Sequence, residues 1–284
     1  VVSSCVDYVD GVLVVDDGCP DKSGQLVLEA YVNNPKVSVI FNGDNRGVGG
    51  AMKSGYRWAI ENEFDIVVKI DGDGQMDPSL IPTFVEPLLK RRADFVKGNR
   101  FSSPRSIRGM PIHRVIGNGI LSLFSKVSTG YWSLSDPTNG FLAITREVLE
   151  RLEFERLSDG YFFESDLLFR LSIVRAKVLE APMNSIYGSE VSNLRIWRVV
   201  VTFPWMHSKN LIKRLIYNYY VRDWSIGSIE LPLGLALMIG GTAFGLTRFD
   251  EANEVGEVVS AGEAVTTAIA IILGFQLLLS FVTQ

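Results

Sequence analysis

Two long segments near the C-terminus contain no charged residue at all. They cover residues 231–246 and 264–282. A helix that crosses a bilayer needs about 20 apolar residues, so the second segment is long enough by itself and the first needs its flanks. The sequence therefore predicts a transmembrane helical hairpin from 228 to 284. A helical hairpin buried in a soluble core is the alternative.

The charges around these two segments are asymmetric. Residues 247–263 contain Arg248 as their only basic residue, against five acids at 250, 251, 254, 257 and 263. Before the first segment, Lys209, Lys213, Arg214 and Arg222 accompany apolar residues at helical spacing. This pattern predicts an amphipathic helix on an anionic membrane surface, with residues 1–194 in the cytoplasm and the acidic loop on the opposite side. A surface helix packed on the preceding domain is the alternative.

In the first 194 residues, short apolar runs alternate with amphipathic segments. Strands are predicted at residues 12–15, 37–41, 64–70, 93–97, 141–144 and 177–182. Helices are predicted between them, including one at 78–92 with Asp77 as its N-cap. The alternation indicates an α/β fold with a mainly parallel sheet covered by helices.

Composition excludes several kinds of site. A net charge of −4 gives no support for a nucleic-acid partner. Cys5 and Cys19 are too few for a disulfide framework and are expected to be reduced thiols. His113 and His207 are isolated, which leaves little material for a zinc site or a Ser-His-Asp triad. A homo-oligomer is left open.

The run Ile70-Asp71-Gly72-Asp73-Gly74-Gln75 places acids directly after a strand. Ligands bind at this edge of open α/β sheets, and hard oxygen donors suit Mg²⁺ or Mn²⁺ carrying a substrate diphosphate. A calcium loop does not fit, because Met76 and Pro82 stand where Gly and Glu are required. A solvated turn is the alternative for the Asp-x-Asp pattern itself.

Two further segments suit phosphate groups. Residues 45–50 form a glycine-rich stretch that lacks the dinucleotide fingerprint, since the third glycine would fall on Met52. It either cradles a phosphate or makes a tight strand-to-helix connection. Arg100 follows the fourth predicted strand, and Arg105, Arg108 and Arg114 come after it. These guanidinium groups suit a second, phosphate-bearing substrate, or they are solvated surface groups.

Six motifs occur in the order found in family 2 glycosyltransferases. They are Val15-Asp16-Asp17-Gly18, Asn45-Arg46-Gly47 with Gly49 and Gly55, Asp71-Gly72-Asp73-Gly74-Gln75, Gly98-Asn99-Arg100-Phe101, Asn139-Gly140-Phe141 and Glu180-Ala181-Pro182. The chain most resembles the branch of dolichol-phosphate mannose synthases and polyprenyl-phosphate glycosyltransferases. Bacterial members of that branch carry a similar C-terminal membrane hairpin.

The resemblance implies a GT-A (Rossmann-like) domain over residues 1–194, interfacial amphipathic helices over 195–227 and a transmembrane hairpin over 228–284. The family's first strand is expected to be missing from this sequence. The implied partners are a nucleotide sugar (GDP-mannose, UDP-glucose or UDP-N-acetylglucosamine), a polyprenyl phosphate and the bilayer, with Mg²⁺ or Mn²⁺ as cofactor. The implied activity is an inverting hexosyl transfer at the cytoplasmic membrane face.

Residue roles are implied by the same resemblance. The nucleotide sugar is expected at Asp16, Asp17, Asn45, Gly47, Lys53 and Asp71. The metal is expected at Asp71, Asp73 and Gln75, and the acceptor phosphate at Arg100, Arg114 and Asn118. Asp136, Glu164 and Asp166 are candidates for sugar contacts or orientation, although Glu164 and Asp166 also suit the first turn of a helix.

The chemistry of the acceptor separates the competing functions. A phosphate monoester is mostly dianionic at neutral pH and needs little help from a general base. A sugar hydroxyl acceptor, as in an enzyme that extends a lipid-linked glycan, would need a carboxylate base. An inactive, truncated scaffold paralogue is the third alternative, against which the complete set of metal ligands argues.

Overall fold

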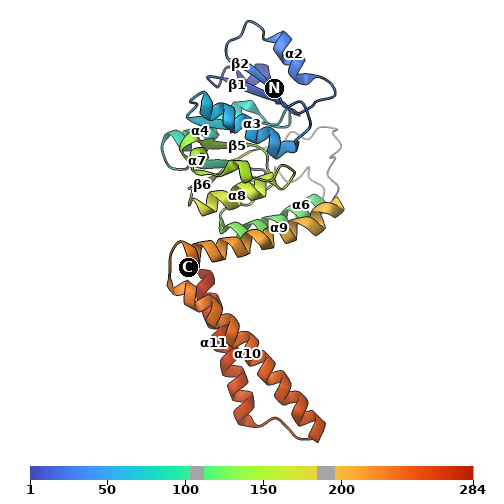
Figure 1. Cartoon of the computed structure of the whole chain (residues 1–284), viewed down its shortest axis with the longest axis vertical. Coiled ribbons are helices and arrows are strands. Elements are labelled where there is room, and N and C mark those ends of the chain that lie inside the picture. The colour runs from blue at the N-terminus through green and yellow to red at the C-terminus, as the bar shows by residue number, and fades with distance from the viewer. Residues whose placement is uncertain (103–111, 184–195, 284) are drawn as a thin grey trace. The chain divides into compact units, whose positions relative to one another are not determined.

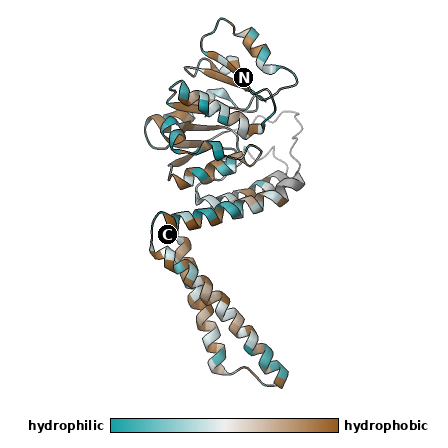
Figure 2. Ribbon diagram, viewed as in Figure 1, coloured by the Kyte–Doolittle hydropathy of each residue, from teal (hydrophilic) through white to brown (hydrophobic). Residues whose placement is uncertain are grey.

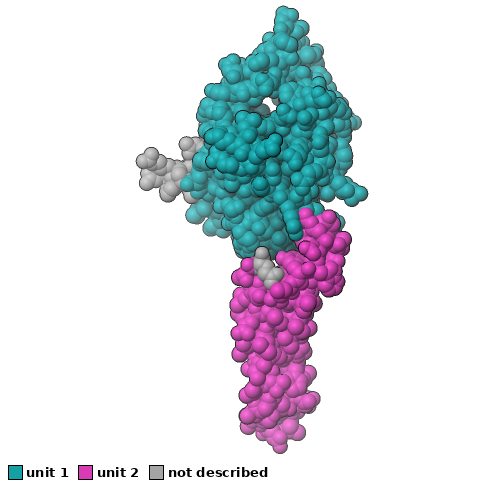
Figure 3. Space-filling model, turned by 90° about the vertical axis from the view of Figure 1, so that its left-hand side faces the viewer, with its two compact units in different colours: residues 1–214 teal, residues 215–284 magenta. Residues whose placement is uncertain are grey.

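The computed structural model describes residues 1–102, 112–183 and 196–283, without the side chains of His113, Arg114 and residues 196–200. The chain divides into two compact units, residues 1–214 and 215–284 (Figure 3). The first unit is α/β and the second is helical. The predicted domain boundaries at 194 and 227 differ from this division and stay a prediction.

Strands and helices alternate along the first unit (Figure 1). The strands are β1 Val12–Asp16, β2 Val37–Phe41, β3 Ile66–Lys69, β4 Phe95–Asn99, β5 Leu142–Thr145 and β6 Val178–Pro182. The helices are α1 Val2–Cys5, α2 Ser23–Ala30, α3 Gly47–Glu61, α4 Ile81–Leu89, α6 Ile112–Thr129, α7 Arg146–Arg151, α8 Phe163–Ile173 and α9 Ile196–Ile216. Asp77 caps a short 3₁₀ turn, Pro78–Leu80, before α4, by accepting from Ser79 N at 2.9 Å.

The strands form two sheets. β1 pairs with β2 in parallel, and a second sheet has the order β3-β5-β4-β6. In it β3, β4 and β6 share one direction, and β5 runs against them. The predicted parallel direction therefore holds for every strand of that sheet except β5. An apolar run of four residues carries no signal of its direction.

The reversal of β5 builds the edge where the candidate site lies. Leu142, the first residue of β5, is paired with Lys69 at the end of β3 and with Lys97 of β4. The turn that leads into β5 therefore lies between the C-terminal ends of β3 and β4. That turn contains Asp136, Asn139 and Gly140.

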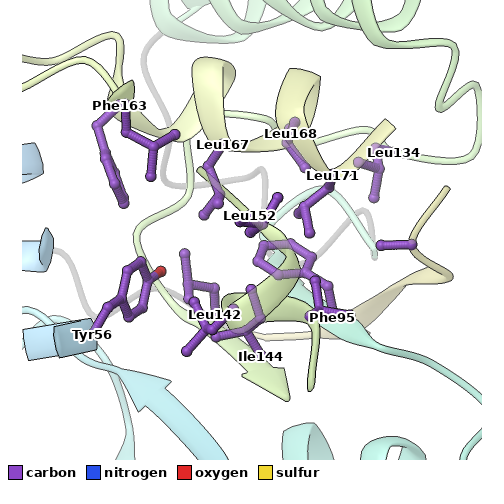
Figure 4. Close-up of a cluster of buried hydrophobic side chains, with 14 residues drawn as sticks. Tyr56, Phe95, Leu134, Leu142, Ile144, Leu152, Phe163, Leu167, Leu168 and Leu171 are labelled. Carbon is purple, nitrogen blue, oxygen red and sulfur yellow. The ribbon is translucent and has the colours of Figure 1, made fainter. Parts of the chain in front are cut away.

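Two apolar cores cover the faces of this sheet. Leu142 and Ile144 join Phe95 and the α8 leucines on one side (Figure 4). Phe141 and Ala143 join Val96 and Phe84 on the other, with the Phe84 and Phe141 rings stacked at 4.0 Å between centroids. Because successive strand residues point to opposite faces, β5 supplies both cores and is held rigidly between them.

The outer edges of β1 and β3 have no partner strand in the described part of the chain. A cavity of about 1060 Å³ is lined by the consecutive residues 12–15 and 66–70 of these strands. Alternate strand residues point to opposite faces, so a cavity lined by all of them lies beside the strand edges, in the plane of the sheet.

The second unit contains the two apolar segments as helices α10 Ile226–Val255 and α11 Ala261–Thr283 (Figure 2). Both are long and apolar enough to cross a membrane by length and composition. Gly234, Gly241 and Gly274 are buried between them, and a Cβ on Gly274 would lie 2.8 Å from Met238. Small residues let the two helix backbones approach closely.

The acidic loop predicted at 247–263 is mostly helical. α10 continues to Val255 and ends at Gly256, whose φ of 69° is the left-handed conformation that closes a helix. Arg248 pairs with Glu251 at 2.6 Å, one turn along the helix. Such pairs support helix where hydropathy alone predicts a loop, so the connection shrinks to residues 256–260.

Candidate active site

Asp71 lies just beyond β3 and is paired with the buried Lys69. Lys69 Nζ is 2.8 Å from Asp71 Oδ1 and 3.5 Å from Glu164 Oε1, which comes from the first turn of α8. Burial disfavours the charged form of Lys69, but attraction to Glu164 and Asp71 together outweighs it and raises the pKa of Lys69. The lysine is therefore a permanent cation, and two of the predicted site carboxylates share it.

Gly140 lets the Lys69–Asp71 pair lie close to the turn that precedes β5. A Cβ at Gly140 would lie 2.7 Å from Lys69 Nζ and 3.0 Å from Met76 Cε, and closer still to Asp71 Oδ2. A side chain at this position would displace the ends of the Asp71, Lys69 and Met76 side chains. The glycine of the Asn139-Gly140-Phe141 motif therefore allows the carboxylate to lie where it does.

Asp73 is exposed, and its Oδ1 accepts from Gln75 N at 3.0 Å. Among the described residues no group of three His, Cys, Asp or Glu side chains is placed to enclose a metal ion. Two carboxylates at an open edge nevertheless fit Mg²⁺ or Mn²⁺, because Mg²⁺ is usually held by one or two protein carboxylates together with substrate phosphates and water. Asp71 and Asp73 fit that donor set, with Gln75 beside them.

Lys97 is a second buried lysine at this edge. Its side chain donates to the Asn139 carbonyl oxygen at 2.6 Å and is 1% exposed. Burial lowers the pKa of Lys97 to about 8, although Glu164 and Asp136 act in the opposite direction. Lys97 thus holds the backbone of the turn before β5 in place through this hydrogen bond.

Arg100 and Asp136 form a two-point ion pair. Arg100 Nε and Nη2 each lie 2.7 Å from an Asp136 oxygen, and the Arg100 backbone N–H donates to the same carboxylate at 3.1 Å. Asp136 is fully buried, whereas the Arg100 side chain is 23% exposed. Arg100 also donates to Thr138 Oγ1 at 3.2 Å, and that hydroxyl donates to Asn118 Oδ1 at 3.2 Å. Three predicted site residues are therefore brought together.

Glu180 ties β6 to the same network. Its carboxylate accepts from Asn99 Nδ2 at 2.5 Å, from Asp136 N at 3.2 Å and from Ser135 N. The Asn99 and Glu180 of the sequence motifs thus support the Arg100–Asp136 pair. Their role is to hold the loop after β4 against the β5 turn.

Asp16 and Asp17 follow β1 and have different surroundings. The buried Asp16 accepts from Cys19 N at 2.8 Å and from Gly24 N at 2.7 Å, so both oxygens shape the turn into α2. Asp17 accepts from Asn42 Nδ2 at 2.7 Å and from Arg46 N at 3.0 Å. Asp17 therefore joins the ends of β1 and β2 while remaining partly open.

The glycine-rich stretch packs against residues 158–160. Gly47 has a φ of 78°, and a Cβ there would lie 2.6 Å from Asp159 O, while Gly49 N donates to that oxygen at 2.8 Å. Lys53 pairs with Asp159 Oδ1 at 2.7 Å, and Asn45 Oδ1 accepts from Gly47 N at 3.1 Å. Gly47 and Gly49 therefore allow a close backbone contact with residues 158–160, and the choice between a phosphate cradle and a tight strand-to-helix connection stays a prediction.

Asp166 points away from Glu164. Its oxygens accept from Ser158 N at 3.0 Å and from Asn210 Nδ2 of α9 at 3.2 Å. Residues two apart on a helix do not share a face, so the two acids serve different neighbours. Arg114 lies on α6, but its side chain is outside the described residues, as are Arg105 and Arg108 entirely.

Sequence reasoning missed Lys69 and Lys97, and it assigned no role to Glu180 of the Glu180-Ala181-Pro182 motif. A lysine within an apolar strand that is buried on both faces is unusual, and this was the available signal for the first two. Lys69 closes the run Ile66-Val67-Val68, and Lys97 follows Phe95-Val96. Each lysine sits where its strand reaches the site.

The family model described as "Glycosyl transferase family 2" matches residues 1–153. The undecaprenyl-phosphate mannosyltransferase of Micrococcus luteus is 31% identical over 212 residues, covering 70% of this chain and 86% of that protein. The UDP-N-acetylglucosamine–dolichyl-phosphate N-acetylglucosaminyltransferase of Methanococcus voltae is 28% identical over 216 residues, covering 72% and 85%.

Among solved structures, the fold is similar to glucosyl-3-phosphoglycerate synthase from Mycobacterium tuberculosis in complex with Mn²⁺, UDP-glucose and phosphoglyceric acid. The TM-score is 0.52 with 20% identity, covering 75% of this chain and 72% of that one. At this identity the likeness establishes the GT-A fold of the first unit.

Proposed function

Because the chain belongs to glycosyl transferase family 2, we propose that it transfers a hexose from a nucleotide sugar to a polyprenyl phosphate, with inversion at the anomeric carbon. The observation that carries the proposal is the edge where β3 and β4 end and β5 begins. There Asp71 follows β3 and pairs with Lys69, and the network of Arg100, Asp136 and Asn118 joins the end of β4 to the turn before β5. Carboxylates suited to a metal-bound diphosphate and a partly exposed guanidinium at one edge suit two phosphate-bearing substrates.

Asp71, Asp73 and Gln75 are proposed to hold Mg²⁺ or Mn²⁺, and the Mn²⁺ complex of the structural neighbour supports the second ion. When bound, the metal neutralises charge on the leaving diphosphate. Lys69 Nζ, 2.8 Å from Asp71 Oδ1, holds this carboxylate in place. Gly140 leaves the space that this arrangement needs.

The acceptor end is proposed at Arg100, Arg114 and Asn118. Arg100 is oriented by Asp136, so its role is to position the lipid phosphate while that phosphate attacks the anomeric carbon. A dianionic phosphate needs little general-base help. Asp136, Glu164 and Asp166 are therefore assigned to orientation, and Asp136 and Asp166 are already committed to hydrogen bonds.

The donor is proposed to be GDP-mannose, UDP-glucose or UDP-N-acetylglucosamine, with Asp16, Asp17, Asn45, Gly47 and Lys53 on the nucleotide side. The relatives support more than one sugar, since one is a mannosyltransferase and another an N-acetylglucosaminyltransferase by name. The cavity between the β1 and β3 edges has room for the family's first strand, which is expected to be missing from this sequence. We propose that a strand fills it, parallel to both neighbours, with its carboxyl end between Asp16 and Asp71.

The proposed location is the membrane, with α10 and α11 as a multi-pass hairpin and the first unit in the cytoplasm. The two candidate spans, and the presence of Arg248 as the single basic residue in 247–263, support this arrangement. A membrane-bound transferase that extends a lipid-linked glycan is the second candidate function. Glu164 supports it as the candidate base, because its side chain is 13% exposed and shares Lys69 with Asp71.

A product assay tests the proposal. The full chain, in bilayers, is given each radiolabelled nucleotide sugar with polyprenyl phosphate and Mg²⁺ or Mn²⁺, and with dephosphorylated polyprenol as the matched control. The expected product is lipid-extractable, labile to mild acid and absent from the control. Label in an extended glycan would replace the proposal with the second function, and no product from any donor would favour an inactive scaffold.

A further inference from the structure

Lys69 has two carboxylates within reach and lies closer to one of them. Its Nζ is 2.8 Å from Asp71 Oδ1, a hydrogen-bond distance. It is 3.5 Å from Glu164 Oε1, beyond the usual N–H···O range of about 2.7–3.2 Å. The Lys69 side chain is 7% exposed, against 36% for Asp71 and 13% for Glu164. The ammonium therefore contacts Asp71 from the protein side, and Asp71 is the most open member of the three.

The pairing of the strands explains why Glu164 is within reach. Lys69 of β3 and Lys97 of β4 are both paired with Leu142 of β5, and residues paired across antiparallel strands lie on the same face of a sheet. Leu142 packs with leucines of α8 on that face (Figure 4). Glu164 lies in the first turn of α8. Both lysines thus lie on the face that this helix covers.

The other two cations described at this edge have different partners. Lys97 Nζ donates to the Asn139 carbonyl oxygen at 2.6 Å. Arg100 forms its two-point pair with the buried Asp136. Lys69 differs from both, because its closest partner is a carboxylate that is also a proposed metal ligand.

A metal ion on Asp71 would change the surroundings of Lys69. The ammonium opposes a divalent cation on the same carboxylate, because like charges repel strongly where little water separates them. Lys69 is too deeply buried to turn to water, and a buried charge that loses its partner is costly. It therefore needs a second anion, and Glu164 is the carboxylate already beside it.

We propose that Lys69 competes with the metal for Asp71 and that Glu164 takes up the ammonium when the metal binds, an inference that rests on the metal site of the proposed function. Lys69 and Glu164 then set the affinity for the metal without being ligands. Lys69 weakens the binding of a bare cation, and Glu164 strengthens it by attracting Lys69 away from Asp71. Removal of the two residues should therefore have opposite effects, whereas a purely structural ion pair would weaken binding when either member is lost.

Binding of Mn²⁺ alone, without donor or acceptor, tests the proposal. The full chain is placed in phosphatidylcholine nanodiscs, which carry no net lipid charge, and free Mn²⁺ is measured by electron paramagnetic resonance at one fixed pH. Lys69→Met should lower the Kd for Mn²⁺ at least about tenfold, and Glu164→Gln should raise it at least about tenfold. The matched controls are Lys90→Met and Glu86→Gln, which remove the same charges from an exposed pair and should leave the Kd unchanged.

A double-mutant cycle separates displacement of Lys69 from a general effect of charge. If Glu164 acts through Lys69, Glu164→Gln has no effect on the Kd once residue 69 is methionine, whereas independent charges would have additive effects. The double variant removes both members of the buried pair, so it leaves Glu164 without an unpaired charge if Lys69→Met alone fails to fold. It should bind Mn²⁺ more tightly than the unsubstituted protein.

Three results would overturn the proposal. A Kd of Lys69→Met equal to or above that of the unsubstituted protein would mean that the lysine only orients Asp71. Equal effects of Glu164→Gln in the two backgrounds would mean that Glu164 does not act through Lys69. Either result, with binding abolished by Asp71→Asn, would leave the metal site of the proposed function in place. Mn²⁺ binding that survives Asp71→Asn would reject that site and this proposal together.

Discussion

Arg100 and Asp136 hold each other by two parallel hydrogen bonds of 2.7 Å, and the aspartate of this pair is fully buried. Two loops that are 36 residues apart in the chain are joined in this way. An ion pair with one member completely out of water depends strongly on its partner, since the remaining charge cannot be solvated.

We therefore expect Arg100→Met to lower the free energy of unfolding of the first unit by about 3 kcal/mol. The matched control is Arg146→Met, which removes a pair with the exposed Asp65 and should cost under about 1 kcal/mol. Urea denaturation of the full chain in nanodiscs, followed by tryptophan fluorescence, measures both. Equal losses for the two variants would contradict the prediction.

Asp71→Asn and Asp73→Asn should each abolish transfer and leave the fold intact, because affinity for a hard cation depends on carboxylate charge. The electron paramagnetic resonance signal of free Mn²⁺ measures binding independently of activity, and Asp65→Asn is a control at an exposed aspartate. Binding by both variants as in the unsubstituted protein, together with activity in excess EDTA, would remove the metal from this site.

Gly140→Ala should disrupt the site through one methyl group. The new Cβ overlaps Asp71 Oδ2 and lies 2.7 Å from Lys69 Nζ, so the Lys69–Asp71 pair must move. We expect at least a tenfold loss of kcat/KM, equivalent to about 1.4 kcal/mol, and weaker Mn²⁺ binding. Gly72→Ala is the control, because nothing lies within 4 Å of its Cβ. A Gly140→Ala enzyme as active as Gly72→Ala would refute the steric explanation.

His207 should make stability depend on pH. Burial lowers the pKa of His207 to about 4, below its ordinary value of 6.5, so the folded protein favours the neutral ring. The stabilisation is complete above pH 6.5 and is lost as the pH falls towards 4, in total about 3 kcal/mol. Unfolding midpoints measured between pH 7 and pH 4 should fall for the unsubstituted protein and much less for His207→Asn. Parallel curves for the two proteins would exclude His207 as the titrating group.

Membrane orientation can be tested by cysteine labelling in intact cells. In a Cys19→Ser background, a cysteine at Asn253 near the end of α10 should react with an impermeant thiol reagent, and a cysteine at Ser23 should not. Both positions are exposed, so access to the compartment decides the result. Labelling of Ser23→Cys alone would reverse the topology and place the donor outside the cytoplasm.

The sequence by itself determined the local elements and the kind of residue at the end of each strand. The apolar runs at residues 12–15, 37–41 and 64–70 predicted strands that the structure contains, and acids follow the first and third runs. The two charge-free segments are long helices. These features depend on neighbours in the chain, so hydrophobic periodicity and composition are sufficient to identify them. The same information predicted Asp71 and Asp73 beside a strand end, and Arg100 after the next strand.

Tertiary structure alone decided which residues meet. The direction of β5, the sharing of Lys69 by Asp71 and Glu164, and the hydrogen bond from Asn210 to Asp166 arise from contacts between distant segments. The same is true of α6, whose buried Ser128 meets the polar His207 of α9 at 2.8 Å. Periodicity locates the two sides of a helix, but only the packed neighbours determine which side is buried, because a side chain's burial depends on what the rest of the chain brings to it.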